Sequence, residues 1–333
     1  MIGTGQSNIQ TSAAPGKRSA IRYLMGEGRG IIFVPMNTLS GLLLAMRPRS
    51  WTKNLFVFAG VLFGRIWDAQ AFAIALLGAI GFSVLSGAIY MINDVADRKA
   101  DRLHPVKRNR PVASGRVSAK AAMVSALVVA AVVLGISWFL STGYALVLSC
   151  YLVVQVLYSL GLKHVVILDA LIIAGGFVLR ALAGVEIALD AGYRVSISPW
   201  LIVCTFFLAV FLAFSKRRAE VVSLGGGAAG HRRNLAFYST ALLDQMTGVA
   251  TAASLMGYAI YTVSERTITM VSDKLWLTIP FVAYGIFRYQ YLVHQKGLGG
   301  APEKLLLRDK GLLLNVVLWL ISVFVVLRFH PAG

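Results

Sequence analysis

Long apolar stretches alternate with short polar segments along almost the whole chain. A helix needs roughly 20 mainly apolar residues to cross about 30 Å of hydrocarbon. The pattern therefore predicts an all-α, polytopic membrane protein. The first stretch is the least regular, because Arg47, Pro48, Arg49 and Lys53 interrupt its N-terminal half. The nine predicted spans are residues 42–64, 70–92, 119–140, 143–162, 165–189, 199–215, 242–263, 275–293 and 311–328.

The N-terminal segment, residues 1–35, is polar and contains many Gly, Ser and Ala residues. It lacks the short apolar core and the cleavage site of a signal peptide. We expect this segment to be a flexible cytoplasmic tail and residues 36–333 to form a single transmembrane domain.

The overall composition supports the membrane assignment. Of the 333 residues 57% are hydrophobic and 14% are charged, and the mean hydropathy is +0.72. Soluble domains carry about 25% charged residues, so an ordinary soluble enzyme is excluded. Cys150 and Cys204 lie in apolar stretches and are predicted to be small core residues rather than disulfide partners.

The charge balance is strongly basic, with 32 Lys and Arg against 14 Asp and Glu, for a formal net charge of +18. In a soluble protein this excess would suggest nucleic acid. Here most basic residues fall in alternate loops, as the positive-inside rule predicts for cytoplasmic loops. We therefore expect no nucleic-acid partner, a location in the inner (cytoplasmic) membrane, a cytoplasmic N-terminus and an external C-terminus. The basic residues on the opposite side are Arg65, Arg194, Arg266, Lys274 and Arg328.

Acidic residues are scarce, and three of them gather at the end of the second span. Asp94, Asp97 and Asp101 have the spacing of one helical face, with Asn93 beside them. Neighbouring carboxylates repel one another unless a cation neutralises them, and Mg²⁺ is commonly held by one or two carboxylates together with substrate phosphates. The alternative is that the three acids pair with their basic neighbours at a solvated helix end.

The loop that follows is basic and is shaped by Pro105, Pro111 and Gly115. Guanidinium groups can bind phosphate oxygens in a bidentate manner. The loop therefore predicts a phosphate-binding segment, although topology alone would also enrich it in positive charge. Its candidate residues are Lys107, Arg108, Arg110 and Arg116.

These segments resemble motifs of the UbiA superfamily of intramembrane transferases. The run Asn93-Asp-x-x-Asp97-x-x-x-Asp101 and its basic loop are similar to the first motif, and Tyr158-Ser-Leu-Gly-Leu-Lys163 is similar to a Tyr-x-x-x-x-Lys element, with Asp169 just beyond. The resemblance implies a UbiA-like bundle of nine helices with a cytoplasm-facing active-site cavity. It also implies that Mg²⁺ on Asp94, Asp97 and Asp101 binds a diphosphate donor, while Tyr158 and Lys163 neutralise charge.

Four further segments are similar to decaprenyl-phosphate phosphoribosyltransferases: residues 47–54, 176–184, 215–220 and 305–309. The resemblance implies transfer of 5-phosphoribose from 5-phosphoribosyl 1-diphosphate to a polyprenyl (decaprenyl) phosphate. The product would be a precursor for cell-envelope arabinose.

The negative charge of these substrates predicts that basic residues outside the basic loop also line the site. A 5-phosphate, a diphosphate and a lipid phosphate in one pocket call for more cations than a single loop supplies. We expect the others to come from Arg49 and Lys53, from Lys163, and from the run Lys216, Arg217 and Arg218. Lys53 and this run are candidates for binding the acceptor or the 5-phosphate.

Two charged residues in the fifth span need separate explanations. Arg180 lies midway along it, where a charge is costly and usually functional. We expect it to line the substrate cavity, the alternative being a structural partner such as Glu186. Asp169 has no nearby acid that would complete a second, symmetric metal site, because Glu186 lies roughly 25 Å further along the helix and cannot reach the same end. Asp169 is therefore expected to assist the first motif or to orient Lys163.

Two other functions remain open. One is a UbiA-type prenyltransferase that moves a polyprenyl chain from its diphosphate to an aromatic acceptor. The other is an anion transporter with a basic vestibule, although transporters often carry internal repeats and none is persuasive here. Bare apolar helix faces also make a homo-oligomer plausible.

Overall fold

The computed structural model describes residues 21–22, 34–35, 38–64, 66, 68–195, 198–224, 235, 237–300, 305–306 and 308–330. Within these ranges the fold is helical, apart from an antiparallel pair of short strands, β1 (Ile21–Arg22) and β2 (Val34–Pro35). The rest of the predicted N-terminal tail lies outside the described residues. The α-helices are α1 (Thr38–Ala45), α2 (Ala59–Phe63), α3 (Ala69–Ala96), α4 (Arg98–Leu103), α5 (Ala119–Leu140), α6 (Thr142–Leu160), α7 (Leu168–Asp190), α8 (Pro199–Leu224), α10 (Thr240–Val263), α11 (Glu265–Met270), α12 (Ile279–Lys296) and α14 (Lys310–Phe329).

The predicted membrane character is confirmed. Among the described helices, α3, α5, α6, α7, α8 and α14 are long and apolar enough to cross a bilayer. Helices satisfy their backbone hydrogen bonds internally, as a chain in hydrocarbon requires. The protein is therefore a multi-pass membrane protein, and each of the nine predicted ranges contains helix.

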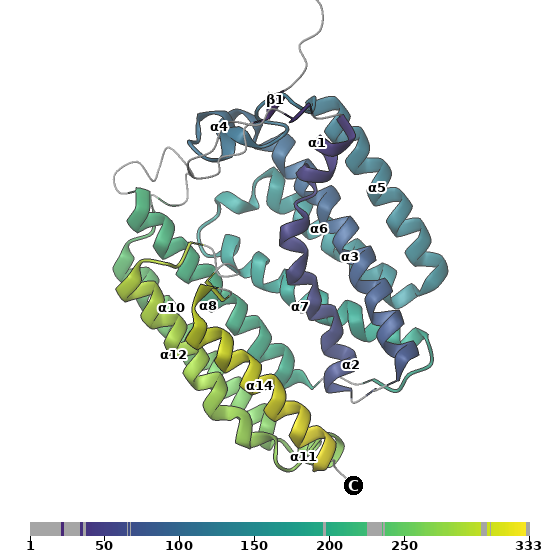
Figure 1. Ribbon diagram of the computed structural model, residues 1–333, viewed down its shortest axis with the longest axis vertical. Coiled ribbons are helices and arrows are strands. Elements are labelled where there is room, and N and C mark those ends of the chain that lie inside the picture. The colour runs from purple at the N-terminus through teal and green to yellow at the C-terminus, as the bar shows by residue number, and fades with distance from the viewer. Residues whose placement is uncertain are drawn as a thin grey trace, which may run out of the picture.

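The long helices pack side by side in two halves (Figure 1). One apolar cluster joins α1, α3, α5, α6 and α7, and a second joins α7, α8, α10, α12 and α14. Helix α7 contributes to both, through Ala183 and Ile187 to the first and through Ala170 and Ala174 to the second. Small residues let neighbouring helices approach closely, so α7 holds the two halves of the bundle together.

The first predicted span is not one regular helix. It consists of α1, the 3-10 helix η1 (Pro48–Phe58) and the short helix α2. The break falls at Arg47, which has a left-handed φ of 53°, because Pro48 cannot donate a helical hydrogen bond and disfavours helical geometry in the residue before it. Segment η1 packs against α7, where a Cβ at Gly184 would collide with the carbonyl of Val57.

Candidate active site

The helix that carries the acidic run is interrupted at one residue, yet Asp94 and Asp101 still contact the same guanidinium nitrogen, as their predicted common face allows. Helix α3 ends at Ala96 and α4 begins at Arg98, with Asp97 between them. Asp94 and Asp101 are buried and share one cation, whereas Asp97 is partly exposed and bonds to another. The three carboxylates meet cations from three separate parts of the chain.

Asp94 is the most buried of the three acids, with 1% of its surface exposed. One of its oxygens, Oδ1, accepts bonds from Arg47 and from Nη1 of Arg110 at 3.2 Å. The same Nη1 lies 2.6 Å from Oδ2 of Asp101. Arg47 also lies over the ring of Tyr90, with its guanidinium carbon 4.8 Å from the ring centroid. Arg47 was not among the predicted site residues, although its place in the interrupted first span was a signal for it.

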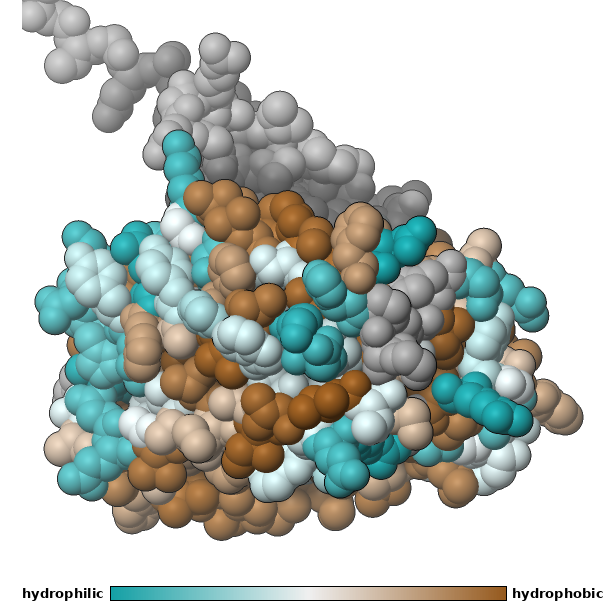
Figure 2. Space-filling model, turned by 90° about the horizontal axis from the view of Figure 1, so that it is seen from below, coloured by the Kyte–Doolittle hydropathy of each residue, from teal (hydrophilic) through white to brown (hydrophobic). Residues whose placement is uncertain are grey.

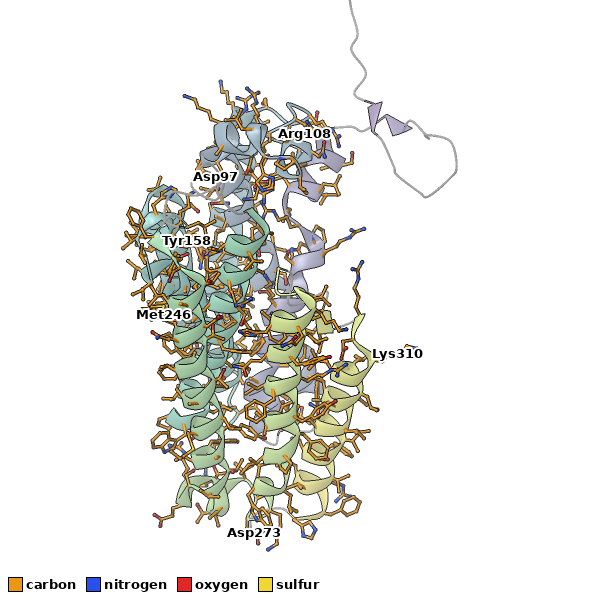
Figure 3. The ribbon with its side chains drawn as sticks, turned by 90° about the vertical axis from the view of Figure 1, so that its left-hand side faces the viewer. Asp97, Arg108, Tyr158, Met246, Asp273 and Lys310 are labelled. Carbon is orange, nitrogen blue, oxygen red and sulfur yellow. The ribbon has the colours of Figure 1, made fainter. Side chains whose placement is uncertain are left out.

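The structure brings Lys163, one of the predicted site residues, next to the acidic motif. Lys163 lies in the 3-10 helix η3 (Leu162–His164) and is buried. Its Nζ donates to Oδ1 of Asp97 at 2.5 Å and to Oδ1 of Asn93 at 3.5 Å. Tyr158, one turn earlier on α6, is half-buried and interacts electrostatically with Arg217. Figure 3 shows Asp97, Arg108 and Tyr158 toward one end of the bundle and Asp273 at the other.

The basic loop folds back beside the acids. Arg102 donates to the carbonyl of Ala113 at 3.1 Å, and Val112 and Val117 are buried in a small apolar cluster. Arg110 is thereby directed at Asp94 and Asp101. Of the other predicted phosphate-binding residues, Arg108 and Arg49 are exposed, while Lys107, Arg116 and Lys53 are half-buried.

Asp169 does not contact Lys163, contrary to one of the two roles expected for it. It is fully buried on α7, and Oδ2 accepts from Nε of Arg217 at 2.7 Å while Oδ1 accepts from the Tyr238 hydroxyl at 3.0 Å. The Tyr238 hydroxyl in turn accepts from the backbone N–H of Ile167 at 2.6 Å. Burial raises the pKa of Tyr238 to about 12, so this hydroxyl remains a donor at neutral pH. Both oxygens of Asp169 are thus used to join α7 to α8 and to the segment before α10.

The predicted run Lys216, Arg217 and Arg218 is divided between different partners. Arg217 is buried and also bonds to Glu220 at 2.7 Å. Arg218 bonds to Asp244 on α10 at 2.5 Å, and Lys216 is half-buried. Arg217 therefore joins α8 to α7 through Asp169. Its charge is already matched by two carboxylates.

Arg180 is buried in the middle of the bundle, as its position in the fifth span predicted. Its Nε donates to Oδ1 of Asn54 at 2.8 Å, its Nη2 to the hydroxyl of Tyr151 at 2.8 Å, and its Nη1 to the carbonyl of Gly176 at 2.5 Å. Its guanidinium carbon also lies 5.3 Å from the ring centroid of Phe177. The alternative partner considered from the sequence, Glu186, is not among these groups.

The acidic run offers carboxylate oxygens to a metal ion. In the described part of the chain, no group of three or more His, Cys, Asp or Glu side chains is already arranged around a common point. However, Oδ2 of Asp94 is buried without a hydrogen-bond partner, and Asp101 approaches the same guanidinium nitrogen. Carboxylate oxygens are suitable ligands for Mg²⁺. The donor chemistry therefore fits this ion, provided that Arg47 and Arg110 exchange their contacts.

Known proteins resemble the chain in both sequence and fold. It is 33% identical over 306 residues to the decaprenyl-phosphate phosphoribosyltransferase of Mycolicibacterium smegmatis, covering 89% of this chain and 95% of the relative. The Mycobacterium tuberculosis protein of the same name is 30% identical over 301 residues, covering 89% and 97%. A UbiA homolog from Archaeoglobus fulgidus bound to GPP and Mg²⁺ superposes with a TM-score of 0.64 at 18% identity, covering 86% of this chain and 99% of its own.

The family assignment rests on most of the chain. The model of the UbiA prenyltransferase family matches residues 35–308, which include the acidic motif, the basic loop and Lys163. The resemblance first noted on short motifs thus extends over helices α1 to α12. The chain is a membrane transferase that belongs to the UbiA prenyltransferase family.

Proposed function

We propose that the protein is a Mg²⁺-dependent phosphoribosyltransferase that moves 5-phosphoribose from 5-phosphoribosyl 1-diphosphate to a polyprenyl (decaprenyl) phosphate. The observation that carries this proposal is the meeting of Arg47, Arg110 and Lys163 with the acidic run at one end of the bundle. These cations come from three separate segments and surround acids that suit a divalent ion. Relatives at 30% and 33% identity bear the name of this activity.

The ion pairs of Arg47 and Arg110 with the acidic run can rearrange when a donor with several phosphate groups binds. Asp94, Asp97 and Asp101 would hold Mg²⁺, whose charge would stabilise the diphosphate leaving group. Arg47 and Arg110 would then transfer their hydrogen bonds from carboxylates to phosphate oxygens. Neither guanidinium loses its counter-charge in this exchange, so the cost of rearrangement is small.

Two further polar groups, Lys163 and Tyr158, would act at the C1–O bond that joins the ribose to the diphosphate. Lys163, held by Asn93 and Asp97, and Tyr158 neutralise charge as the C1–O bond to the diphosphate opens. The electron pair leaves on the diphosphate, and an oxygen of the polyprenyl phosphate forms the new bond to C1. This acceptor is already an anion and needs no general base. Catalysis rests on positioning and electrostatics, through an oxocarbenium-like transition state and with inversion at C1.

The acceptor's phosphate and its tail need different surroundings. Arg49, Lys53 and Lys216 are candidates for the acceptor phosphate or the 5-phosphate. An apolar groove of about 400 Å³ runs between α6, α7 and α8 and is lined by residues such as Ile172, Gly175 and Phe206. This groove suits the lipid tail. We propose that the acidic end faces the cytoplasm and that the chain crosses the inner membrane nine times.

A direct assay tests the proposed transfer. Membranes containing the protein are incubated with labelled 5-phosphoribosyl diphosphate, polyprenyl phosphate and Mg²⁺, and the lipid phase is then extracted. We expect label in the lipid phase only when both polyprenyl phosphate and Mg²⁺ are present. Label that stays aqueous, while a prenyl diphosphate is consumed with an aromatic acid, would instead identify a prenyltransferase.

A further inference from the structure

A cavity with both polar and apolar lining lies at the end of the bundle opposite the acidic run. It has a volume of about 150 Å³ and lies between α2, the segment joining α7 to α8, the end of α10, and α11. Figure 2 views the molecule from below, where hydrophilic residues gather in separate patches between hydrophobic ones. The cavity is lined by Gly60, Gly64, Arg194, Val195, Ser198, Leu201, Tyr261, Arg266, Thr267, Met270 and Val271.

The lining is positively charged. Arg194 comes from the segment between α7 and α8, and Arg266 comes from α11, so two exposed arginines from separate parts of the chain line the cavity. None of the described lining residues is acidic. Basic residues are few at this end of the protein, and two of them line this one cavity.

Ser198 provides an independent sign of a missing ligand. Its side chain is 7% exposed, and its Oγ is buried without a hydrogen-bond partner among the described residues. Leaving such a hydroxyl unpaired costs about 1–3 kcal/mol. The carbonyl of Ser198 accepts from Leu201 N at 3.0 Å and from Ile202 N at 3.3 Å, so the backbone of Ser198 is fixed at the cavity wall while its hydroxyl has no partner among the described residues.

The start of α8 adds to the positive potential. Ser198 immediately precedes Pro199, the first residue of this 26-residue helix. The N-terminus of a long helix carries a partial positive charge and favours anions. Two arginines, an unpaired hydroxyl donor and a helix N-terminus thus converge on one small cavity.

We propose that this cavity binds a phosphate group, supplied either by the headgroup of an anionic lipid or by free phosphate. Arginine is well suited to bidentate contact with phosphate oxygens. The volume of 150 Å³ is below the range of about 300–1,000 Å³ that is usual for drug-sized ligands. It admits the phosphate and little more, which excludes the whole of a sugar nucleotide or a polyprenyl chain.

Hydrogen–deuterium exchange on the full-length protein in detergent tests the site locally. The probes are inorganic phosphate, dioleoylphosphatidylglycerol and, as a zwitterionic control, dioleoylphosphatidylcholine. We expect phosphatidylglycerol or phosphate to slow exchange in peptides covering 198–203 and 264–271. Slowing by phosphatidylglycerol alone identifies a lipid headgroup, and slowing by inorganic phosphate identifies free phosphate. No slowing with either, or equal slowing with phosphatidylcholine, would overturn the proposal.

Three variants make the test specific to the lining. Arg194→Gln combined with Arg266→Gln should weaken the apparent affinity roughly tenfold or more, because charge-assisted hydrogen bonds are lost. Arg328→Gln removes a cation from the same end without touching the cavity and should leave the affinity unchanged. Ser198→Ala should keep or raise the melting temperature without ligand, since it removes an unpaired group, yet weaken binding. Unchanged affinity in the double variant would refute the site.

Discussion

The guanidinium of Arg180 donates a hydrogen bond of 2.8 Å to the side-chain carbonyl of Asn54 and so joins α7 to the irregular segment η1. Asn54 also connects this segment to α3, because its amide nitrogen donates to Ser83 at 2.9 Å and to Ser86 at 3.3 Å. Since η1 has the hydrogen bonding of a 3-10 helix and follows a break at Arg47, this pair holds in place the segment that carries Arg49 and Lys53.

Removing either member of the pair should destabilise the protein. Arg180→Met leaves the buried Asn54 acceptor unpaired, and Asn54→Leu leaves Nε of Arg180 unpaired, each at a cost of about 1–3 kcal/mol. The double variant should be more stable than the sum of the two losses predicts, with a coupling of about 0.5–3 kcal/mol. Thermal unfolding in detergent measures the cycle. Strictly additive losses would show that the two side chains do not depend on each other.

The acidic run should be required for turnover but not for folding. Asp94→Ala and Asp97→Ala each remove a carboxylate proposed to hold Mg²⁺, so we expect Mg²⁺-dependent transfer to be abolished. The melting temperature should confirm that both variants fold. Asp273→Asn, at the opposite end of the molecule (Figure 3), is the matched control and should keep wild-type activity. Near wild-type activity in either alanine variant would contradict the proposal that these carboxylates hold Mg²⁺.

Much of this arrangement could be predicted from local patterns in the sequence. Apolar stretches longer than a bilayer crossing placed α3, α5 and α7, and the spacing of scarce acids identified Asp94, Asp97 and Asp101. The sequence also placed Lys163 in the same candidate site as these acids, through its resemblance to a known motif. In these cases the relevant information is contained in one short segment or in one known pattern.

Other features depend on tertiary contacts that no local pattern encodes. The pairing of Asp169 with Arg217 is set by how α7 packs on α8, and the two residues are 48 positions apart. For Arg180 the sequence predicts a place in the substrate cavity or, alternatively, a partner such as Glu186, whereas the structure supplies the neutral side chains of Asn54 and Tyr151. A buried cation can be satisfied by several neutral acceptors, and sequence spacing does not reveal which ones the fold brings near.

The buried pair of Asp169 and Arg217 gives a prediction about stability. Asp169 is fully buried and Arg217 nearly so, and Arg217→Gln would leave the carboxylate without its main counter-charge. Breaking a buried pair in this way typically costs about 3–5 kcal/mol. Asp169→Asn combined with Arg217→Gln removes both charges and should recover part of the loss. The melting temperatures of the single and double variants measure this, and a double variant less stable than Arg217→Gln alone would contradict the pairing.

Asp309 predicts a dependence of stability on pH. It caps α14 by accepting from Leu312 N at 2.8 Å, and Arg288 bonds to it at 2.9 Å. The hydrogen bond from Arg288 is the main cause that lowers the pKa of Asp309 in the folded protein below its ordinary value. The stabilisation is therefore present above the unfolded-state pKa of about 3.9 and is lost as the pH falls through the lower folded value.

Asparagine retains the ability to cap a helix but has no titrating charge, so Asp309→Asn isolates this contribution. At neutral pH the variant should melt at a lower temperature than the wild-type protein. As the pH is lowered from 5 to 3, the difference between the two melting temperatures should start to shrink near a pH of about 3.9, because the unfolded wild-type carboxylate takes up a proton there while the folded one, with its lower pKa, does so only at lower pH. Other acids titrate in the same range, but they do so in both proteins and their contributions cancel in the difference. A difference that stays constant over this range would show that the charge on Asp309 does not stabilise the attachment of α14 to α12.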